Sequence, residues 1–345
     1  MGFITGARLM TLAIGLAGAL MFWAAGLPLP FLFGPMAACL VAALSGVRLK
    51  GMGEVGVAAR TILGVAVGAS VTPELLGLLP TMAVSLALMP FYIAVIALIG
   101  VPFFHRVCGL DRVTSYYAAM PGGLQDMLAF GEEAGGDVRA LSLIHATRVL
   151  IIVTVVPWVL TAFYGISLTN PIGTPAADLP VQELVILAFA AIAGWKLFER
   201  LGIFGASIIG PLVLTAALSL GDIVHVRPPA EAIMAAQYFI GLGIGVQYVG
   251  VTLTELRRVV ALGVVFVLIL AVLTAIFTEI VYLLGISGPV ETFLAFAPGG
   301  QAEMTVLAIV AGADLGFVVV HHLARLILVI TLAPVAARLW GIRRP

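Results

Sequence analysis

The stretch PGGLQDMLAFGEEAGGDVRALSLIHATRVLIIVTVVP, residues 121–157, returns 177 residues later as PGGQAEMTVLAIVAGADLGFVVVHHLARLILVITLAP, residues 298–334. Aligned without a gap, 11 of the 37 pairs are identical, and they are Pro121/Pro298, Gly122/Gly299, Gly123/Gly300, Met127/Met304, Ala134/Ala311, Gly135/Gly312, Asp137/Asp314, His145/His322, Arg148/Arg325, Thr154/Thr331 and Pro157/Pro334. Asp126/Glu303 is a conservative twelfth pair. A shared apolar composition would not select Asp, His and Arg, so the pattern predicts two homologous halves.

The repeat continues upstream at an offset of 176 residues, where four further pairs match: Gly18/Gly194, Gly26/Gly202, Gly34/Gly210 and Pro35/Pro211. We therefore predict a first membrane repeat over residues 1–164, a linker over 165–181 and a second membrane repeat over 182–345. The linker is the longest polar stretch and carries Pro and Gly.

Composition places the chain in the bilayer. Of its 345 residues, 62% are hydrophobic and 10% are charged, with a mean hydropathy of +1.20. Soluble domains carry roughly 25% charged residues, so this chain cannot cover a water-exposed surface. The net charge is zero, which argues against nucleic-acid binding. Cys39 and Cys108 form no CxxC motif, and neither a disulfide framework nor a zinc site is indicated.

Apolar runs of about 20 residues predict transmembrane helices. Ten fall at about 9–26, 29–46, 55–71, 80–104, 138–163, 182–197, 203–220, 231–250, 259–285 and 315–337. Two further segments, 113–136 and 290–313, are broken by Pro-Gly-Gly, and we expect each to be a re-entrant hairpin or a broken helix. The predicted fold is an all-α integral membrane protein of about ten transmembrane helices.

Positive charge predicts the orientation of the spans. With the N-terminus in the cytoplasm and each hairpin returning to its own side, Arg227 alone lies outside. The cytoplasmic set is then Arg8, Arg48, Lys50, Arg106, Arg112, Arg139, Lys196, Arg200, Arg257, Arg258, Arg338, Arg343 and Arg344. Five spans in each half would invert the halves relative to each other and leave both termini in the cytoplasm.

The PGG…GAD…H..R pattern resembles the AbrB-type membrane protein family, and the resemblance covers essentially the whole chain. The resemblance implies a duplicated domain in a bacterial-type inner membrane. Members of that family are labelled as regulators of gene expression in some places and as ammonia monooxygenases in others. The resemblance brings no established catalytic or binding residues with it.

The Pro-Gly-Gly segments allow two interpretations. Proline removes a donor and the glycine pairs (Gly122 and Gly123, Gly299 and Gly300) permit positive φ, so the chain can turn or unwind. The first interpretation is a tight turn between helices. The second is a helix N-terminus whose amides face a solute, since paired broken helices in inverted halves indicate a transporter site.

Two carboxylates follow the glycines. Asp126 and Glu303 either cap the first helical turn or coordinate a cation or exchange a proton, and the two roles are compatible. Gln125 and Gln301 are plausible polar neighbours, although they do not align with each other.

Deeply placed arginines require a partner. Arg148 and Arg325 lie about eleven residues into apolar helices, with His145 and His322 three residues earlier on the same face. Asp137 and Asp314 precede the arginines by eleven residues. Eleven residues are close to a whole number of helical turns, so we expect these aspartates near the same helix face as the arginines. One interpretation is a structural ion pair with the hairpin, and the other is an arginine that binds an anionic substrate. Each histidine either relays protons or packs through a hydrogen bond.

The functional prediction is a secondary transporter or exporter of a small molecule or ion, without a cofactor. A regulator of gene expression is the alternative, and an oxygenase is a weaker one because the sequence lacks a converging set of metal ligands. His321 and His322 are adjacent, and adjacent helical side chains diverge. No nucleotide-binding or nucleophile motif appears, and we predict no enzyme. Expected partners are lipid and solute, with homo-oligomers left open.

Overall fold

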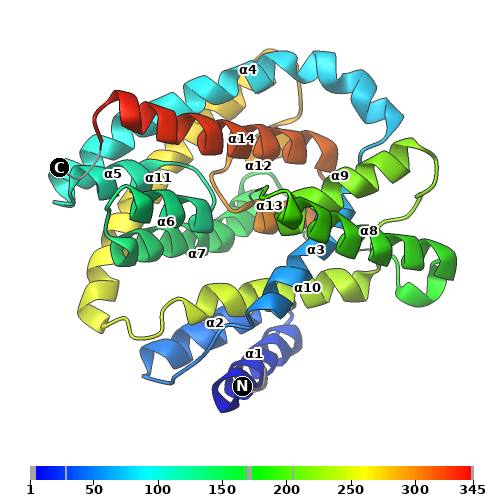
Figure 1. The fold of residues 1–345 in the computed structure, drawn as a ribbon, viewed down its shortest axis with the longest axis horizontal. Coiled ribbons are helices and arrows are strands. Elements are labelled where there is room, and N and C mark those ends of the chain that lie inside the picture. Colours follow the sequence, from blue (N-terminus) through cyan, green and yellow to red (C-terminus); the bar gives the residue numbers. More distant parts are fainter. Residues whose placement is uncertain (1–4, 28, 167, 169–172, 204–205, 343–345) are drawn as a thin grey trace. The chain divides into compact units, whose positions relative to one another are not determined.

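A computed structural model describes residues 5–27, 29–166, 168, 173–203 and 206–342 (Figure 1). The first run of helices is α1 (Gly6–Ala24), α2 (Pro30–Leu44), α3 (Glu54–Gly68), α4 (Pro73–Pro102), α5 (Arg112–Ala119), α6 (Leu124–Glu133) and α7 (Val138–Ala162). The second run is α8 (Val181–Arg200), α9 (Ala206–Leu220), α10 (Ala230–Val246), α11 (Leu253–Leu283), α12 (Pro289–Phe296), α13 (Gln301–Ala311) and α14 (Leu315–Leu339). A π-helix, η1 (Phe103–Val107), follows α4, and a 3-10 turn, η2 (Ala176–Asp178), precedes α8.

All ten predicted spans coincide with α-helices, but not all of these helices reach full length. Six are long and apolar enough to cross a bilayer, and they are α1, α4 with η1, α7, α8, α11 and α14. The apolar helices α2, α9 and α10 have 15–17 residues, and α3 has 15. At a rise of 1.5 Å per residue, 15 residues cover about 22 Å, which is less than the ~30 Å hydrocarbon core.

The two Pro-Gly-Gly segments interrupt helices, as predicted. One lies between α5 and α6, and the other lies between α12 and α13. Proline disfavours helical backbone in the residue before it. Accordingly, Met120 has φ −64° and ψ 133°, and Ala297 has φ −56° and ψ 126°. The sequence therefore ends each of these helices locally, because the residue directly before the proline is no longer helical.

The two runs of helices match in order and nearly in length. Residue counts are 19, 15, 15, 30, 8, 10 and 25 in the first run. They are 20, 15, 17, 31, 8, 11 and 25 in the second.

The chain packs as two compact units, each of which takes segments from both runs. Unit 1 comprises residues 1–77, 167–253 and 309–316, and unit 2 comprises residues 78–166, 254–308 and 317–345. The units describe packing, whereas the predicted repeats concern the order of the sequence, so the repeat boundaries stay a prediction.

Glycines set the packing of unit 1. α1 meets α2 where Gly18 lies against Gly34, and α8 meets α9 where Gly194 lies against Gly210, so closely that an added Cβ would meet backbone atoms. α3 packs on α9 through Gly64 and Gly68, and α10 packs on α2 through Gly241 and Gly245. Small residues let membrane helices approach in this way.

Unit 2 contains the buried charges. Among the side chains that the structure describes, the buried aspartate, glutamate and arginine residues are Asp126, Arg148, Glu303 and Arg325, and all four belong to this unit. Its core also contains a hydrogen bond between the Tyr92 and Thr274 hydroxyls, 2.9 Å long, and the ring of Phe296 packs on Tyr92 at 5.3 Å.

Candidate functional site

Buried side chains of α7 bind the first helix break. The Arg148 guanidinium donates from Nη1 to the Met120 carbonyl (2.9 Å) and from Nη2 to the Gly122 carbonyl (2.8 Å). One turn earlier, His145 Nε2 lies 3.1 Å from the Tyr117 carbonyl. Arg148 is 3% exposed and His145 is fully buried. These side chains therefore bind carbonyls at the end of α5 and in the segment just after it, where helical partners are missing.

The same contacts recur at the second break. Arg325 Nη1 donates to the Ala297 carbonyl (2.7 Å) and Nη2 to the Gly299 carbonyl (2.8 Å), while His322 Nε2 lies 2.9 Å from the Leu294 carbonyl. In both places the bonded partners are 28, 28 and 26 residues apart. A cation at a helix C-terminus also complements the helix dipole.

These contacts revise the interpretation in which each arginine forms a structural ion pair with its hairpin. Neither Arg148 nor Arg325 forms an ion pair among the described residues. Asp137 is exposed and instead caps α7, where its carboxylate accepts a hydrogen bond from Ala140 N at 3.1 Å. Asp314 is exposed and directly precedes α14. The arginines thus hold the breaks through main-chain oxygens.

The glycines of the breaks serve close packing. Gly123 has φ −65° and ψ 147°, and none of Gly122, Gly123, Gly299 and Gly300 is among the glycines with positive φ. A Cβ on Gly122 would lie 2.6 Å from Met127 Cε, and one on Gly299 would lie 2.7 Å from Met304 Cε. The expected use of positive φ is therefore wrong. Gly122 and Gly299 instead leave room for the methionine side chains that cover them.

The two carboxylates fold back over their own helix starts. Asp126 and Glu303 stand in the first turns of α6 and α13 and are 2% and 8% exposed. A Cβ on Gly123 would meet Asp126 Oδ2 at 2.6 Å, and one on Gly300 would meet Glu303 Oε2. An acid that reaches back from this position complements the helix N-terminus. The capping role has geometric support, while the cation or proton role stays a prediction.

Polar atoms without a hydrogen bond remain near both breaks. Within the described part of the chain, His145 Nδ1, Arg148 Nε and Gln301 Nε2 are buried and have no hydrogen-bond partner. The second break differs, because His322 Nδ1 lies 2.9 Å from Arg325 Nη2. The Gln125 side chain lies outside the described residues. Unpaired buried polar atoms indicate places for water or a ligand.

Sequence reasoning missed a buried pair in unit 2. His321 Nε2 lies 2.9 Å from Ser85 Oγ of α4, and both side chains are fully buried. His321 aligns with Ile144 in the first half, so the repeat pattern gave no signal for it. The sequence feature that could have indicated this pair is a histidine inside an apolar run.

Unit 2 also contains a cavity, but its lining offers few polar groups. This cavity of about 350 Å³ is lined mainly by apolar side chains, with the Arg139–Glu255 ion pair (2.9 Å) among its lining. In the described residues no group of three or more His, Cys, Asp or Glu side chains is arranged to hold a metal ion.

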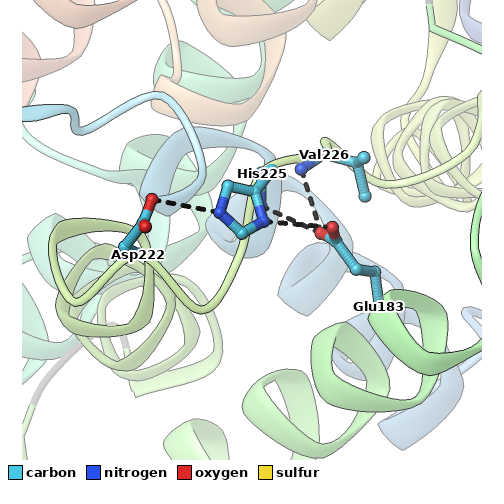
Figure 2. A network of polar contacts seen from close by, with 4 residues as sticks. All are labelled: Glu183, Asp222, His225 and Val226. Atoms are coloured by element: carbon cyan, nitrogen blue, oxygen red, sulfur yellow. Dashed lines mark hydrogen bonds and ion pairs between the residues drawn. The ribbon is translucent and has the colours of Figure 1, made fainter.

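A polar cluster in unit 1 ties a loop to the start of α8 (Figure 2). The Glu183 carboxylate accepts hydrogen bonds from the backbone amides of His225 (2.9 Å) and Val226 (3.2 Å). The His225 ring contacts Asp222 through Nε2 at 3.1 Å and Glu183 through Nδ1 at 3.2 Å. The hydrogen bond to Asp222 and then that to Glu183 raise the pKa of His225 above 6.5.

This cluster predicts a pH-dependent stability. The pKa of His225 is raised in the folded state, so the protonated ring stabilises the fold. This stabilisation is complete below the ordinary pKa of histidine and is lost as pH rises through the raised pKa. Wild type should therefore exceed His225→Gln in melting temperature by more at about pH 6 than at about pH 8.5. Asp222→Asn should reduce this pH dependence. A difference between wild type and His225→Gln that is constant with pH would contradict the assignment.

The apolar helices, the buried charges and the carbonyl-bound arginines define a polytopic membrane protein. Residues 31–341 match the family model described as "Transition state regulatory protein AbrB", and the chain belongs to this family.

Two relatives align over most of their length. The chain is 26% identical to "Uncharacterized protein YhjN" of Bacillus subtilis (strain 168), over 95% of this chain and 91% of that protein. It is 25% identical to "Putative regulator AbrB" of Escherichia coli (strain K12), over 92% of this chain and 91% of that protein. The predicted family resemblance is confirmed.

Proposed function

We propose that the chain is a secondary transporter of a small polar solute, and that the two helix breaks of unit 2 form its binding region. The observation that carries the proposal is the pair of breaks whose carbonyls are bound by Arg148 and Arg325. Broken helices at matching positions of a membrane protein are a sequence pointer to a solute site.

The order of the helices supports two repeats of opposite orientation, as many secondary transporters have. The two runs of helices nearly agree in length, and in each run the break follows the fourth α-helix and the eight-residue helix after it. An odd number of crossings in each half, as the positive charges predict, would place the halves in opposite orientations.

The chemistry of the breaks supports a polar solute. All the buried formal charges among the described side chains lie in unit 2. Unpaired atoms of His145, Arg148 and Gln301 lie at or beside the breaks, where a solute or water could satisfy them. Such groups are costly inside a membrane and are functional candidates by default.

Reconstitution tests the proposal. A panel of small organic acids, amino acids and amines is first screened by thermal stabilisation of the purified chain, and any hit is then followed as flux into proteoliposomes. Glu303→Gln and Asp126→Asn should reduce this flux about tenfold or more, because a lost charge-assisted contact costs about 1.5–3 kcal/mol. Both variants should retain wild-type elution and a cooperative melting transition.

Glu132→Gln is the matched control, because Glu132 is exposed near the end of α6. Its flux should equal that of wild type. Wild-type flux in both carboxylate variants would overturn the assignment of the site. Purified protein that moves no member of the panel, and that captures a cytoplasmic partner, would favour the regulator. That alternative rests on the name of the Escherichia coli relative.

A further inference from the structure

We infer that His321 is a buried proton-binding site and that, given the transporter proposed above, it carries the coupling proton. His321 on α14 is fully buried, and three short contacts define its surroundings. Nδ1 lies 2.8 Å from the Phe317 carbonyl, Nε2 lies 2.9 Å from Ser85 Oγ, and Ser85 Oγ lies 2.9 Å from the Met82 carbonyl.

Counting hydrogens shows that this arrangement has a place for a second proton on the ring. A carbonyl oxygen only accepts, so His321 Nδ1 must carry a hydrogen to bond with Phe317. Ser85 has a single hydroxyl hydrogen, and when that hydrogen is donated to Met82, Oγ offers only lone pairs to His321. All three contacts are hydrogen bonds at once only when Nε2 also carries a hydrogen, which makes the ring an imidazolium.

The neutral ring has a second arrangement. Without the proton on Nε2, the Ser85 hydroxyl turns its hydrogen from the Met82 carbonyl to the ring nitrogen. Ser85 then donates to His321 instead of accepting from it. Each protonation state of His321 therefore has its own set of hydrogen bonds, and rotation of one hydroxyl exchanges the two sets.

The neighbouring His322 shows the opposite behaviour. Its Nε2 must donate to the Leu294 carbonyl, and its Nδ1 must accept from Arg325 Nη2, which can only donate. Those two bonds are complete with one ring hydrogen, and a second hydrogen would break the contact with Arg325. His322 is thus held neutral, whereas His321 can take either protonation state.

The surroundings decide when His321 is charged. The ring centroids of Phe317 and Phe296 lie 4.1 Å and 5.9 Å from the centroid of the His321 ring, so aromatic side chains form part of its surroundings. Arg325 and His322 lie on the same helix, and Tyr92 of α4 packs on Phe296. The positive charge of Arg325, four residues further along α14, opposes a further cation, and the full burial of the ring also disfavours its charged form.

Charge balance indicates what accompanies the proton. The formal charges of Asp126, Glu303, Arg148 and Arg325 cancel within the described buried set of unit 2. A proton on His321 adds one positive charge, and burial of an unbalanced charge is costly. We therefore expect the proton to enter together with one negative charge on the solute, which makes the solute a monoanion.

Nitrogen NMR of the histidine rings tests the site without any solute. The full chain is labelled with 15N-histidine in nanodiscs and titrated from about pH 8.5 to the lowest pH at which it stays folded. The His321 resonances, assigned by their loss in His321→Gln, should change from a neutral to a doubly protonated ring. His322 should stay neutral throughout.

Ser85→Ala identifies the hydroxyl as the switch. It removes the acceptor that the imidazolium needs, so the His321 transition should move to lower pH while the chain stays folded. A His321 ring that stays neutral in wild type at every pH at which the protein is folded would overturn the proposal. The same conclusion follows if Ser85→Ala leaves the transition unchanged.

Flux measurements separate this inference from the function proposed above. Proteoliposomes with an internal pH-sensitive dye should acidify when a transported monocarboxylate or sulfonate enters, and His321→Gln should abolish the acidification. Monoanion flux with acidification unchanged in His321→Gln would overturn the coupling role and leave the transporter intact. If wild type transports no solute, the transporter fails together with the coupling role, and the NMR titration alone decides whether His321 binds a proton.

Discussion

Arg325→Ala should reduce the free energy of unfolding by about 2–6 kcal/mol, because each of the two buried carbonyls left without its donor costs about 1–3 kcal/mol. The side chain is 4% exposed and donates to the Ala297 and Gly299 carbonyls. Alanine leaves both carbonyls, and also His322 Nδ1, without this donor. Water cannot replace the donor at low cost inside a membrane protein.

Unfolding in SDS from mixed micelles measures this loss. Arg325→Lys keeps the charge but not the planar pair of donors, and it should fall between wild type and alanine. Arg338→Ala on the same helix is the control, because Arg338 is exposed in the last turn of α14, and it should change stability by less than about 0.5 kcal/mol. Equal effects of Arg325→Ala and Arg338→Ala would show that the carbonyl contacts do not stabilise the break.

Gly34→Ala should destabilise unit 1 by about 1–3 kcal/mol, the cost of overpacking a tight interface. A Cβ at this position would lie 2.6 Å from Ala19 Cα and closer still to the Gly18 carbonyl. Backbone atoms of two packed helices cannot move aside as a flexible side chain can. The substitution must therefore push α1 away from α2 along their shared interface.

Gly243→Ala is the matched control within unit 1. An added Cβ there meets nothing within 4 Å, and the residue lies inside α10. Alanine should stabilise this helix by up to about 1 kcal/mol, because glycine is the poorer helix former. Thermal melting of the two variants in the same detergent should change in opposite directions. A fall of similar size in both would indicate a general intolerance of alanine rather than a close contact.

The two arginine contacts also explain why the helix breaks do not close. Pro121 and Pro298 end α5 and α12, and the freed carbonyls need donors that lipid cannot supply. Arg148 and Arg325 supply these donors from the next long helix. We expect the breaks to be rigid at these carbonyls.

The sequence by itself determined the membrane class, the places of the helices and the places of the breaks. These features are local: apolar runs form helices in lipid, and a residue before proline avoids helical backbone. The alignment of the two halves also singled out Arg148 and Arg325 and their histidines, because polar identities stand out in an apolar chain.

Only the tertiary structure decided what those side chains bind. Sequence spacing brought Asp137 toward the face of Arg148, yet the fold presents the Met120 and Gly122 carbonyls to the guanidinium and leaves Asp137 exposed. It also placed Ser85 against His321, 236 residues away. The partner of a buried polar group depends on which distant segment reaches its depth, and helical periodicity carries no information about that.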